Sequence, residues 1–293
     1  MLFLVTALWG LFWLPLRKIE EAGVSDIWSV VAINAIPLLI LCPVVLYRRE
    51  HFFSHFNFKL LIGIGMGAGM AFYAIAFLYT TVLRTTLLFY MSPIWATLLS
   101  MLILKESIAI KRWLAIAVGL AGLILILSGS DGTNSSTAFN RGDVFAILSG
   151  LFWGFGTVMI KKSADIPAID LVPSQYFFAT LTALGVLLTT IALPEFRIPG
   201  AEQWMKAMPL IIGFYVCFVL PTIFITTRIA QILSPGRVCL LMMSEVLVAG
   251  ISAPLLAGEA ISAIEWMAGT LIITATLIEV YSSPEEPNPV PGD

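Results

Sequence analysis

The chain repeats one pattern of chemically distinctive residues in its first and second halves, and this repetition constrains its fold more than any other feature. In the early part of each half, a Trp-Gly pair, a basic pair and an aspartate recur at an offset of 144 residues. In the later part, an arginine, a glutamate and a tryptophan recur at an offset of 153 residues. The equivalent residues are Trp9-Gly10 and Trp153-Gly154, Arg17-Lys18 and Lys161-Lys162, Asp26 and Asp170, Arg84 and Arg237, Glu106 and Glu259, and Trp113 and Trp266. The shared spacing indicates an internal duplication.

The composition indicates an integral membrane protein. Hydrophobic residues make up 59% of the chain and charged residues only 12%, whereas about 25% of the residues of a soluble domain are charged. The mean hydropathy is +0.97. The net charge of -2 and the lack of a basic tract argue against a nucleic acid partner. We therefore expect the lipid bilayer and a small molecule as partners.

Ten apolar segments are long enough, or nearly long enough, to cross a bilayer, which takes about 20 residues in a helix. Helices are the expected structure for such runs, because an open sheet edge cannot face lipid. The sequence therefore predicts an all-α integral membrane fold with ten transmembrane helices. The expected spans are 2–17, 27–47, 59–80, 84–104, 112–128, 143–161, 171–193, 208–227, 237–257 and 264–281.

The duplication divides the chain into two five-helix repeats. We expect the first repeat at residues 1–128, a Gly/Ser/Asn-rich linker loop at 129–141, the second repeat at 142–281 and a disordered, Pro-rich acidic tail at 282–293. Because five is an odd number, the second copy must enter the membrane from the opposite side. Inverted repeats of this kind are typical of transporters.

The distribution of Lys and Arg predicts the orientation. Basic residues are more frequent in the loops after the second, fourth, sixth and eighth helices than in the other loops, which favours both termini in the cytoplasm. The apolar start lacks a basic region, so we expect no cleaved signal peptide. The predicted location is a cell membrane, the bacterial inner membrane, with multiple passes.

Several short motifs carry a family resemblance. They are the Trp-Gly motifs Ala7-Leu8-Trp9-Gly10 and Leu151-Phe152-Trp153-Gly154, the segment Met91-Ser92-Pro93-Ile94-Trp95 leading to Lys105-Glu106, and its counterpart Ser244-Glu245-Val246 leading to Gly258-Glu259. Together with the repeat spacing, they resemble the EamA-type branch of the drug/metabolite transporter (DMT) superfamily over nearly all of residues 1–281. The resemblance implies a central cavity between the halves and transport of small metabolites, frequently export.

Glu245 lies inside an apolar run of the expected span 237–257. A carboxylate at the centre of a membrane helix costs about 2.5–3.5 kcal/mol on insertion scales, so it usually faces a cavity or a partner. The repeat places Ser92 at the equivalent position, so this charge is present in one half only. We predict that Glu245 binds substrate, as a proton carrier or as the counter-ion of an amine. A role in hydrogen-bonded helix packing is the alternative.

Aromatic residues extend the predicted site. Trp9 and Trp153 lie within spans at equivalent positions, and their faces suit a planar or cationic substrate. Tyr90 and Trp95 flank Pro93, where we expect a kink in the helix. The predicted substrate-binding set is Glu245, Trp9, Trp153, Tyr90, Trp95, Ser244 and Tyr176.

Four charged residues at helix ends form a second predicted group, with a gating or structural role. Arg84 and Arg237 begin equivalent helices, and Glu106 and Glu259 end them. A carboxylate at such a place is suited to cap the N-terminus of the helix that follows it.

No catalytic set is visible in the sequence. His51 and His55 lack carboxylate or cysteine companions at ligand spacing, so we expect no metal, no cofactor and no enzyme activity. The function predicted is secondary active transport of a small organic metabolite (an amino acid, an amine or a related zwitterion or cation) by alternating access. Proton coupling or exchange would drive it, and export is favoured. An uncoupled facilitator and a non-transporting membrane scaffold are the alternatives, and a homodimer stays open.

Overall fold

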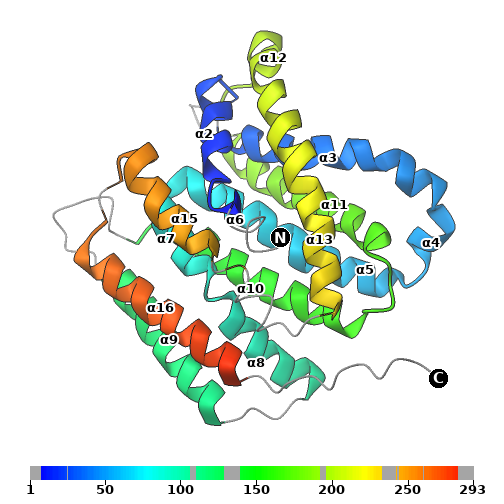
Figure 1. Ribbon diagram of the computed structural model, residues 1–293. Coiled ribbons are helices and arrows are strands. Elements are labelled where there is room, and N and C mark those ends of the chain that lie inside the picture. The colour runs from blue at the N-terminus through cyan, green and yellow to red at the C-terminus, as the bar shows by residue number, and fades with distance from the viewer. Residues whose placement is uncertain are drawn as a thin grey trace, which may run out of the picture.

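The computed structural model describes residues 8–24, 26–105, 110–128, 139–191, 196–232, 242, 244–259 and 261–282. Every regular element within these ranges is a helix (Figure 1). Most of the predicted linker 129–141 and of the predicted tail 282–293 lies outside the described residues. The expected all-α fold is confirmed for the part of the chain that the structure describes.

The helices follow the predicted spans closely in most places. In the first half they are α2 (Trp13–Glu21), α3 (Ile27–Tyr47), α4 (Arg49–Phe53), α5 (Phe56–Ile62), the π-helix η1 (Gly63–Gly67), α6 (Ala68–Tyr79), α7 (Val82–Phe89), α8 (Ser92–Leu104) and α9 (Ile110–Ser128). In the second half they are α10 (Arg141–Lys162), α11 (Ala168–Thr190), α12 (Ala201–Leu210), η2 (Ile211–Val219), α13 (Leu220–Ile232), α15 (Ser244–Ser252), η3 (Ala253–Ala257) and α16 (Ala263–Ser282).

Six helical segments are long and apolar enough to cross a membrane by length and composition. They are Ile27–Tyr47, Phe56–Tyr79, Val82–Ile103, Arg141–Lys162, Ala168–Thr190 and Ala201–Ile232. Shorter apolar helices are Trp113–Leu127, Val248–Ala257 and Ala263–Ala275. These segments confirm a membrane fold with several spans, while the ten-helix inverted repeat stays a prediction.

Among the described residues, three predicted spans differ from the structure by more than small shifts at their ends. The first, 2–17, is described only from residue 8: residues 8 and 9 are helical, residues 10–12 form a turn, and α2 follows. The span 84–104 is broken between α7 and α8, so that Pro93 lies in the first turn of α8, where its missing N–H costs no helical hydrogen bond. The span 208–227 lies within a longer helical segment that runs from Ala201 to Ile232.

The central helices pack closely because small residues lie between them. In Figure 1, α6 and α10 lie near the middle of the molecule, and α9 and α16 lie side by side along one edge. A Cβ atom placed on Gly65 of η1 would lie 2.6 Å from the Cα atom of Gly156 in α10. Only glycine permits this backbone approach, which is the usual role of small residues between membrane helices.

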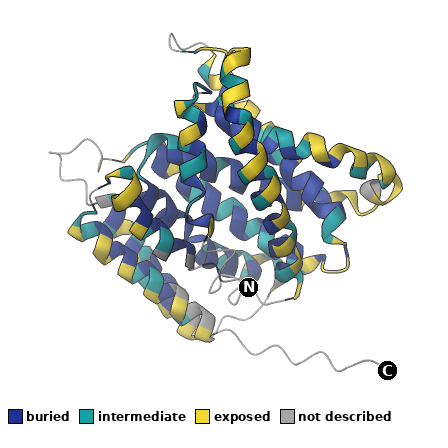
Figure 2. Ribbon diagram, turned by 45° about the horizontal axis from the view of Figure 1, so that its top comes forward, coloured by how far each residue is buried: buried dark blue, intermediate teal, exposed yellow. Residues whose placement is uncertain are grey.

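The outer surface is largely apolar, as expected of helices that face lipid. Buried residues fill the centre of the molecule, and exposed ones lie along the outward sides of the helices (Figure 2). Large exposed aliphatic side chains occur on α3, α8, α9 and α11, and examples are Leu39, Leu102, Ile124 and Leu188. The interior contains buried polar side chains as well, among them Asn34, Gln175 and Glu245.

Candidate functional site

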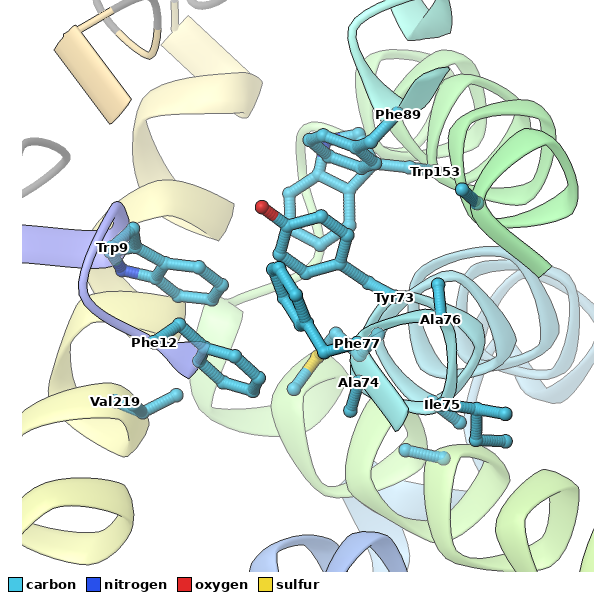
Figure 3. Packing of buried hydrophobic residues seen from close by; sticks show 14 of the residues in the cluster. Trp9, Phe12, Tyr73, Ala74, Ile75, Ala76, Phe77, Phe89, Trp153 and Val219 are labelled. Atoms are coloured by element: carbon cyan, nitrogen blue, oxygen red, sulfur yellow. The ribbon is translucent and has the colours of Figure 1, made fainter. Parts of the chain in front are cut away.

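A small cavity lies at the centre of the described structure, between helices of the two halves. Aromatic side chains form most of its wall (Figure 3). The space that the centre of a water molecule can reach is about 20 Å³, which is enough for one or two waters. The described lining residues are Trp9, Phe12, Ile33, Asn34, Met70, Tyr73, Phe89, Trp153, Tyr176, Tyr215, Val219, Met242 and Glu245.

Glu245 is the carboxylate of this cavity, and it connects the two halves. It lies on α15 and is fully buried. Its Oε1 atom accepts a hydrogen bond of 2.5 Å from the Tyr73 hydroxyl of α6, and its Oε2 atom accepts one of 3.2 Å from the Tyr90 hydroxyl at the end of α7. The single hydroxyl hydrogen of Tyr90 is shared between this carboxylate oxygen and the carbonyl oxygen of Met242, which is the nearer acceptor. Both tyrosines belong to the first half, so the buried carboxylate is held across the interface between the halves.

Tyr73 was not in the predicted set, although the sequence held a signal for it. A tyrosine in the middle of the apolar span 59–80 must find a partner for its hydroxyl, because a buried hydroxyl is usually hydrogen-bonded. A carboxylate in another span is a natural acceptor. What the sequence could not indicate is which of the spans lies beside which.

The two predicted tryptophans meet at the cavity. The ring centroids of Trp9 and Trp153 are 6.5 Å apart, in an edge-on arrangement. The Trp9 indole nitrogen donates to Thr222 of α13 at 3.0 Å, and the Trp153 ring packs edge-on against Phe89. In Figure 3, Trp9 and Phe12 extend from one side of the site, and Phe89 and Trp153 lie on the other.

The glycine after each tryptophan brings that tryptophan close to a helix of the other half. A Cβ atom on Gly10 would lie 2.6 Å from the Glu245 carbonyl oxygen and 3.0 Å from the Ala249 nitrogen. A Cβ atom on Gly154 would lie 2.9 Å from the Ser92 carbonyl oxygen and 2.9 Å from the Ala96 nitrogen. Since Ser92 and Ala96 correspond to Glu245 and Ala249 at the offset of 153, the two contacts are equivalent.

Tyr176 of α11 also lines the cavity. It is 1% exposed, and its hydroxyl has no hydrogen-bond partner among the described residues. The predicted residue Trp95 lies on α8 and packs against Gly154, and it is not among the described residues that line the cavity. Ser244 begins α15.

Arg84 forms a buried ion pair at one end of the molecule. Its Nε and Nη2 atoms donate to Asp143 of α10 at 2.5 Å and 2.9 Å. Both residues are almost completely buried, and Asp143 also completes a capping box with Asn140 at the start of α10. Arg84 therefore ties α7 to α10. The predicted equivalents Arg237 and Glu106 lie outside the described residues.

Glu259 acts at the same end, in a way the sequence did not predict. It accepts hydrogen bonds from Arg17 at 2.6 Å and from the backbone nitrogen of Val82, the first residue of α7, at 2.8 Å. The expected cap on the following helix is wrong for Glu259, because Ser262 and Glu265 cap α16 themselves. The capped helix comes from the other half of the chain, and sequence proximity does not reveal it.

An open cavity of about 600 Å³, which we call the vestibule, lies beside Glu259. Its described lining residues are Arg17, Glu20, Glu21, Phe77, Leu78, Tyr79, Thr80, Thr81, Asn140 and Glu259. Phe77 contacts both Tyr73 and Phe12 of the central cavity, with ring centroids 4.8 Å and 6.3 Å apart. Aromatic packing therefore separates the vestibule from the central cavity.

No group of three or more His, Cys, Asp or Glu side chains is placed to hold a metal ion in the described part of the chain. The polar groups of the central cavity are instead hydroxyl, amide, indole and carboxyl groups. They are suited to binding a small molecule by hydrogen bonds, charge and ring stacking.

The EamA-like transporter family model matches residues 1–128 and 140–281. The uncharacterized transporter YoaV of Bacillus subtilis (strain 168) is 24% identical over 214 residues, which cover 70% of this chain and 69% of that protein. The riboflavin transporter of Vibrio cholerae serotype O1 (strain ATCC 39315 / El Tor Inaba N16961) is 31% identical over 117 residues, or 39% of this chain and 36% of its own.

A solved crystal structure of a protein aligns with 94% of this chain and 94% of its own, at a TM-score of 0.57 and 17% sequence identity. That likeness shows the fold alone.

Proposed function

Because the chain belongs to the EamA-like transporter family, we propose that this multi-pass membrane transporter moves a small organic metabolite through its central cavity by secondary active transport. The observation that carries the proposal is Glu245, a buried carboxylate in an aromatic cavity, held by tyrosines of the opposite half. Ionisable groups inside a membrane protein are costly, and they generally mark a substrate or proton pathway.

Alternating access is supported by the way the two halves meet. The Trp9-Gly10 and Trp153-Gly154 segments make equivalent contacts with α15 and α8, as two inverted repeats around one site would. The central cavity has room for only one or two waters, so a metabolite requires the halves to move apart. We propose that the two parts that move relative to each other are residues 1–128 and 142–281. Both chain termini lie in the cytoplasm in this proposal.

In this cycle Glu245 binds either a proton or an amine of the substrate, and both roles depend on its position between the halves. A proton on Glu245, or an amine of the substrate beside it, would alter its hydrogen bonds to Tyr73 and Tyr90. Since those bonds join α15 to α6 and α7, binding would change how firmly the halves are held together. A ligand shifts the equilibrium between two conformations only if it interacts differently with each of them, and these hydrogen bonds would supply that difference. Export is the direction we favour.

The predicted gating charges fit an end-closing role. Glu259 joins α2 and α7 beside the vestibule, and Arg84 joins α7 to α10. Their contacts hold several helix ends together at one side of the pathway. We propose that the Arg17–Glu259 contact breaks and re-forms as the vestibule changes shape, while Arg84–Asp143 stays a fixed anchor.

Counterflow in proteoliposomes tests the proposal. Vesicles with purified protein are loaded with a mixture of metabolites, and the exchange of labelled compounds is followed. We expect exchange that Glu245→Gln abolishes and that Glu265→Gln preserves. Glu265 is the matched control, since it is a largely buried glutamate that caps its own helix. Equal exchange in wild type and Glu245→Gln would contradict the role of Glu245.

An imposed proton gradient distinguishes a coupled transporter from the uncoupled facilitator. We expect the labelled compound to accumulate against its own gradient when a proton gradient is applied, whereas a facilitator only equilibrates it. A membrane scaffold shows no exchange under either condition.

Riboflavin is a second candidate substrate. One relative is named a riboflavin transporter, and the aromatic walls of the central cavity suit a flat ring system. Riboflavin therefore belongs in the counterflow mixture, and competition by excess riboflavin for the exchange of the other compounds would support this substrate.

A further inference from the structure

Two polar side chains in the central cavity indicate the chemical class of the transported molecule, which we call the cargo. This inference rests on the proposed function of the same site. Glu245 comes from α15 of the second half, and Tyr176 comes from α11 of that half. Both line the cavity, and both are almost fully buried. The walls between them are mostly aromatic.

The Tyr176 hydroxyl is available to a ligand. It is buried, and it has no hydrogen-bond partner among the described residues, although most buried polar side-chain atoms in proteins have one. The other tyrosine hydroxyls of the cavity are engaged, since Tyr73 donates to Glu245 and Tyr215 donates to the Phe12 carbonyl. Because a tyrosine hydroxyl both donates and accepts, Tyr176 is suited to pair with a hydroxyl or a carbonyl of the cargo.

Glu245 retains capacity for a cargo as well. A carboxylate has about four lone-pair positions, and the two tyrosines occupy one position on each oxygen. An ammonium group beside Glu245 would offset its charge in a setting of low dielectric constant. The faces of Trp9 and Trp153 add a further attraction for a cation.

A carboxylate on the cargo would meet the opposite conditions. It would be buried beside Glu245, and two like charges in a site without solvent repel each other strongly. No Lys, Arg or His occurs among the described residues that line the cavity. An anionic group would therefore lose its hydration without a counter-charge from these residues.

We propose that the cargo is an aromatic amine that carries a hydroxyl or carbonyl group at its far end and no free carboxylate. Once the halves move apart, its ammonium group pairs with Glu245, its ring packs against the aromatic wall that includes Trp9 and Trp153, and its polar far end pairs with Tyr176. Tyr176 is thus a specificity-determining residue, and amino acids are excluded by their carboxylate.

Four related probes test each part of this proposal: tyramine, phenethylamine, tyrosine and tyrosine methyl ester. Each is used to compete with labelled tyramine for counterflow in proteoliposomes. We expect tyramine and tyrosine methyl ester to compete at similar concentrations, and tyrosine to need at least about 10-fold more because its carboxylate lacks a counter-charge. Tyrosine that competes as well as its methyl ester would overturn the exclusion of carboxylates.

The variant Tyr176→Phe tests the second contact. We expect it to weaken competition by tyramine roughly 3–10-fold, the size of one lost hydrogen bond between neutral groups, and to leave phenethylamine within about twofold. Tyr281→Phe, at an exposed position, is the control and should change neither. Equal losses for tyramine and phenethylamine would show that Tyr176 acts through packing, which overturns its role in recognition.

These experiments distinguish a failure of the cargo proposal from a failure of the proposed transport function. Glu245-dependent exchange of the metabolite mixture, with no response to any of the four probes, would overturn the cargo class and leave the transporter proposal standing. No exchange of the mixture would overturn the transporter proposal itself.

Discussion

Gly10 lies against the backbone carbonyl of Glu245, and a Cβ atom on Gly10 would come within 2.6 Å of that oxygen. The contact brings Trp9 to the wall of the cavity that Glu245 occupies. The equivalent contact joins Gly154 to Ser92. The Trp-Gly motif therefore has a physical explanation. The glycine permits the close approach of the two backbones, and this approach places the tryptophan side chain at the central cavity.

Gly10→Ala should destabilise the protein. The added methyl group would overlap the Glu245 carbonyl and the Val248 Cβ atom, which lies 2.7 Å away, and overpacking of this kind costs about 1–3 kcal/mol. The melting temperature of the purified protein in detergent measures the effect. Gly213→Ala is the control, since nothing lies within 4 Å of its added Cβ atom. A melting temperature of Gly10→Ala equal to that of the control would refute the close contact.

Tyr73→Phe should impair transport more than Tyr90→Phe. Each change removes one donor to Glu245, and a hydrogen bond to a charged group contributes about 1.5–3 kcal/mol. The hydrogen bond from Tyr73 is shorter than that from Tyr90, at 2.5 Å against 3.2 Å. The single Tyr90 hydroxyl hydrogen is also shared with the Met242 carbonyl oxygen. Initial rates of counterflow check this order, with the exposed Tyr47→Phe as the control. The reverse order would mean that Tyr90 is the main partner of Glu245.

Asp143→Asn should reduce stability strongly. It leaves Arg84 buried without its counter-charge, and removing one partner of a buried ion pair costs about 3–5 kcal/mol. The yield of monodisperse protein on size exclusion and its melting temperature report the loss. Lys206→Met, in the exposed pair with Glu202, should cost at most about 1 kcal/mol. The double change Arg84→Met with Asp143→Leu should restore much of the loss, and its failure to do so would show a role beyond charge pairing.

Glu20 should make stability depend on pH. Burial, reinforced by the nearby Asp26 carboxylate, raises the pKa of Glu20 from about 4.5 to about 7. The folded protein thus keeps a proton that the unfolded chain releases, so stability falls as the pH rises between these values and changes no further above them. Melting temperatures at about pH 5 and about pH 8 should show Glu20→Gln gaining on the wild type at the higher pH. Glu21→Gln, at the exposed neighbouring position, should show no such gain.

Glu259→Gln should loosen the vestibule. The glutamine oxygen can still accept from the Val82 nitrogen, whereas the ion pair with Arg17 is lost. A cysteine in place of Leu78, which lines the vestibule, should then react faster with a membrane-impermeant thiol reagent in a background without Cys42, Cys217 and Cys239. An unchanged labelling rate would show that Arg17 does not restrict the vestibule.

The sequence singled out several residues that line the central cavity, but it did not indicate their contacts. Glu245 could be singled out because a carboxylate in an apolar span is costly, and Trp9 and Trp153 because they repeat. Trp95 was chosen for its place near Pro93, yet the helix break precedes Ser92, and Trp95 packs on Gly154. Side-chain direction depends on where a helix breaks, and a proline does not fix that place to the residue.

Hydropathy and repetition therefore indicated, from the sequence alone, a helical membrane protein with two related segments and a carboxylate, Glu245, inside an apolar run that has Ser92 at the equivalent position. Only the tertiary structure decided that Tyr73 and Tyr90 hold that carboxylate, that the Tyr176 hydroxyl has no hydrogen-bond partner among the described residues, and that Glu259 caps α7. The physical reason is that hydropathy is a property of each span by itself, which follows from its local composition. Hydrogen bonds across helices depend on which spans are neighbours and how each is rotated, and many such arrangements bury the same apolar surface equally well.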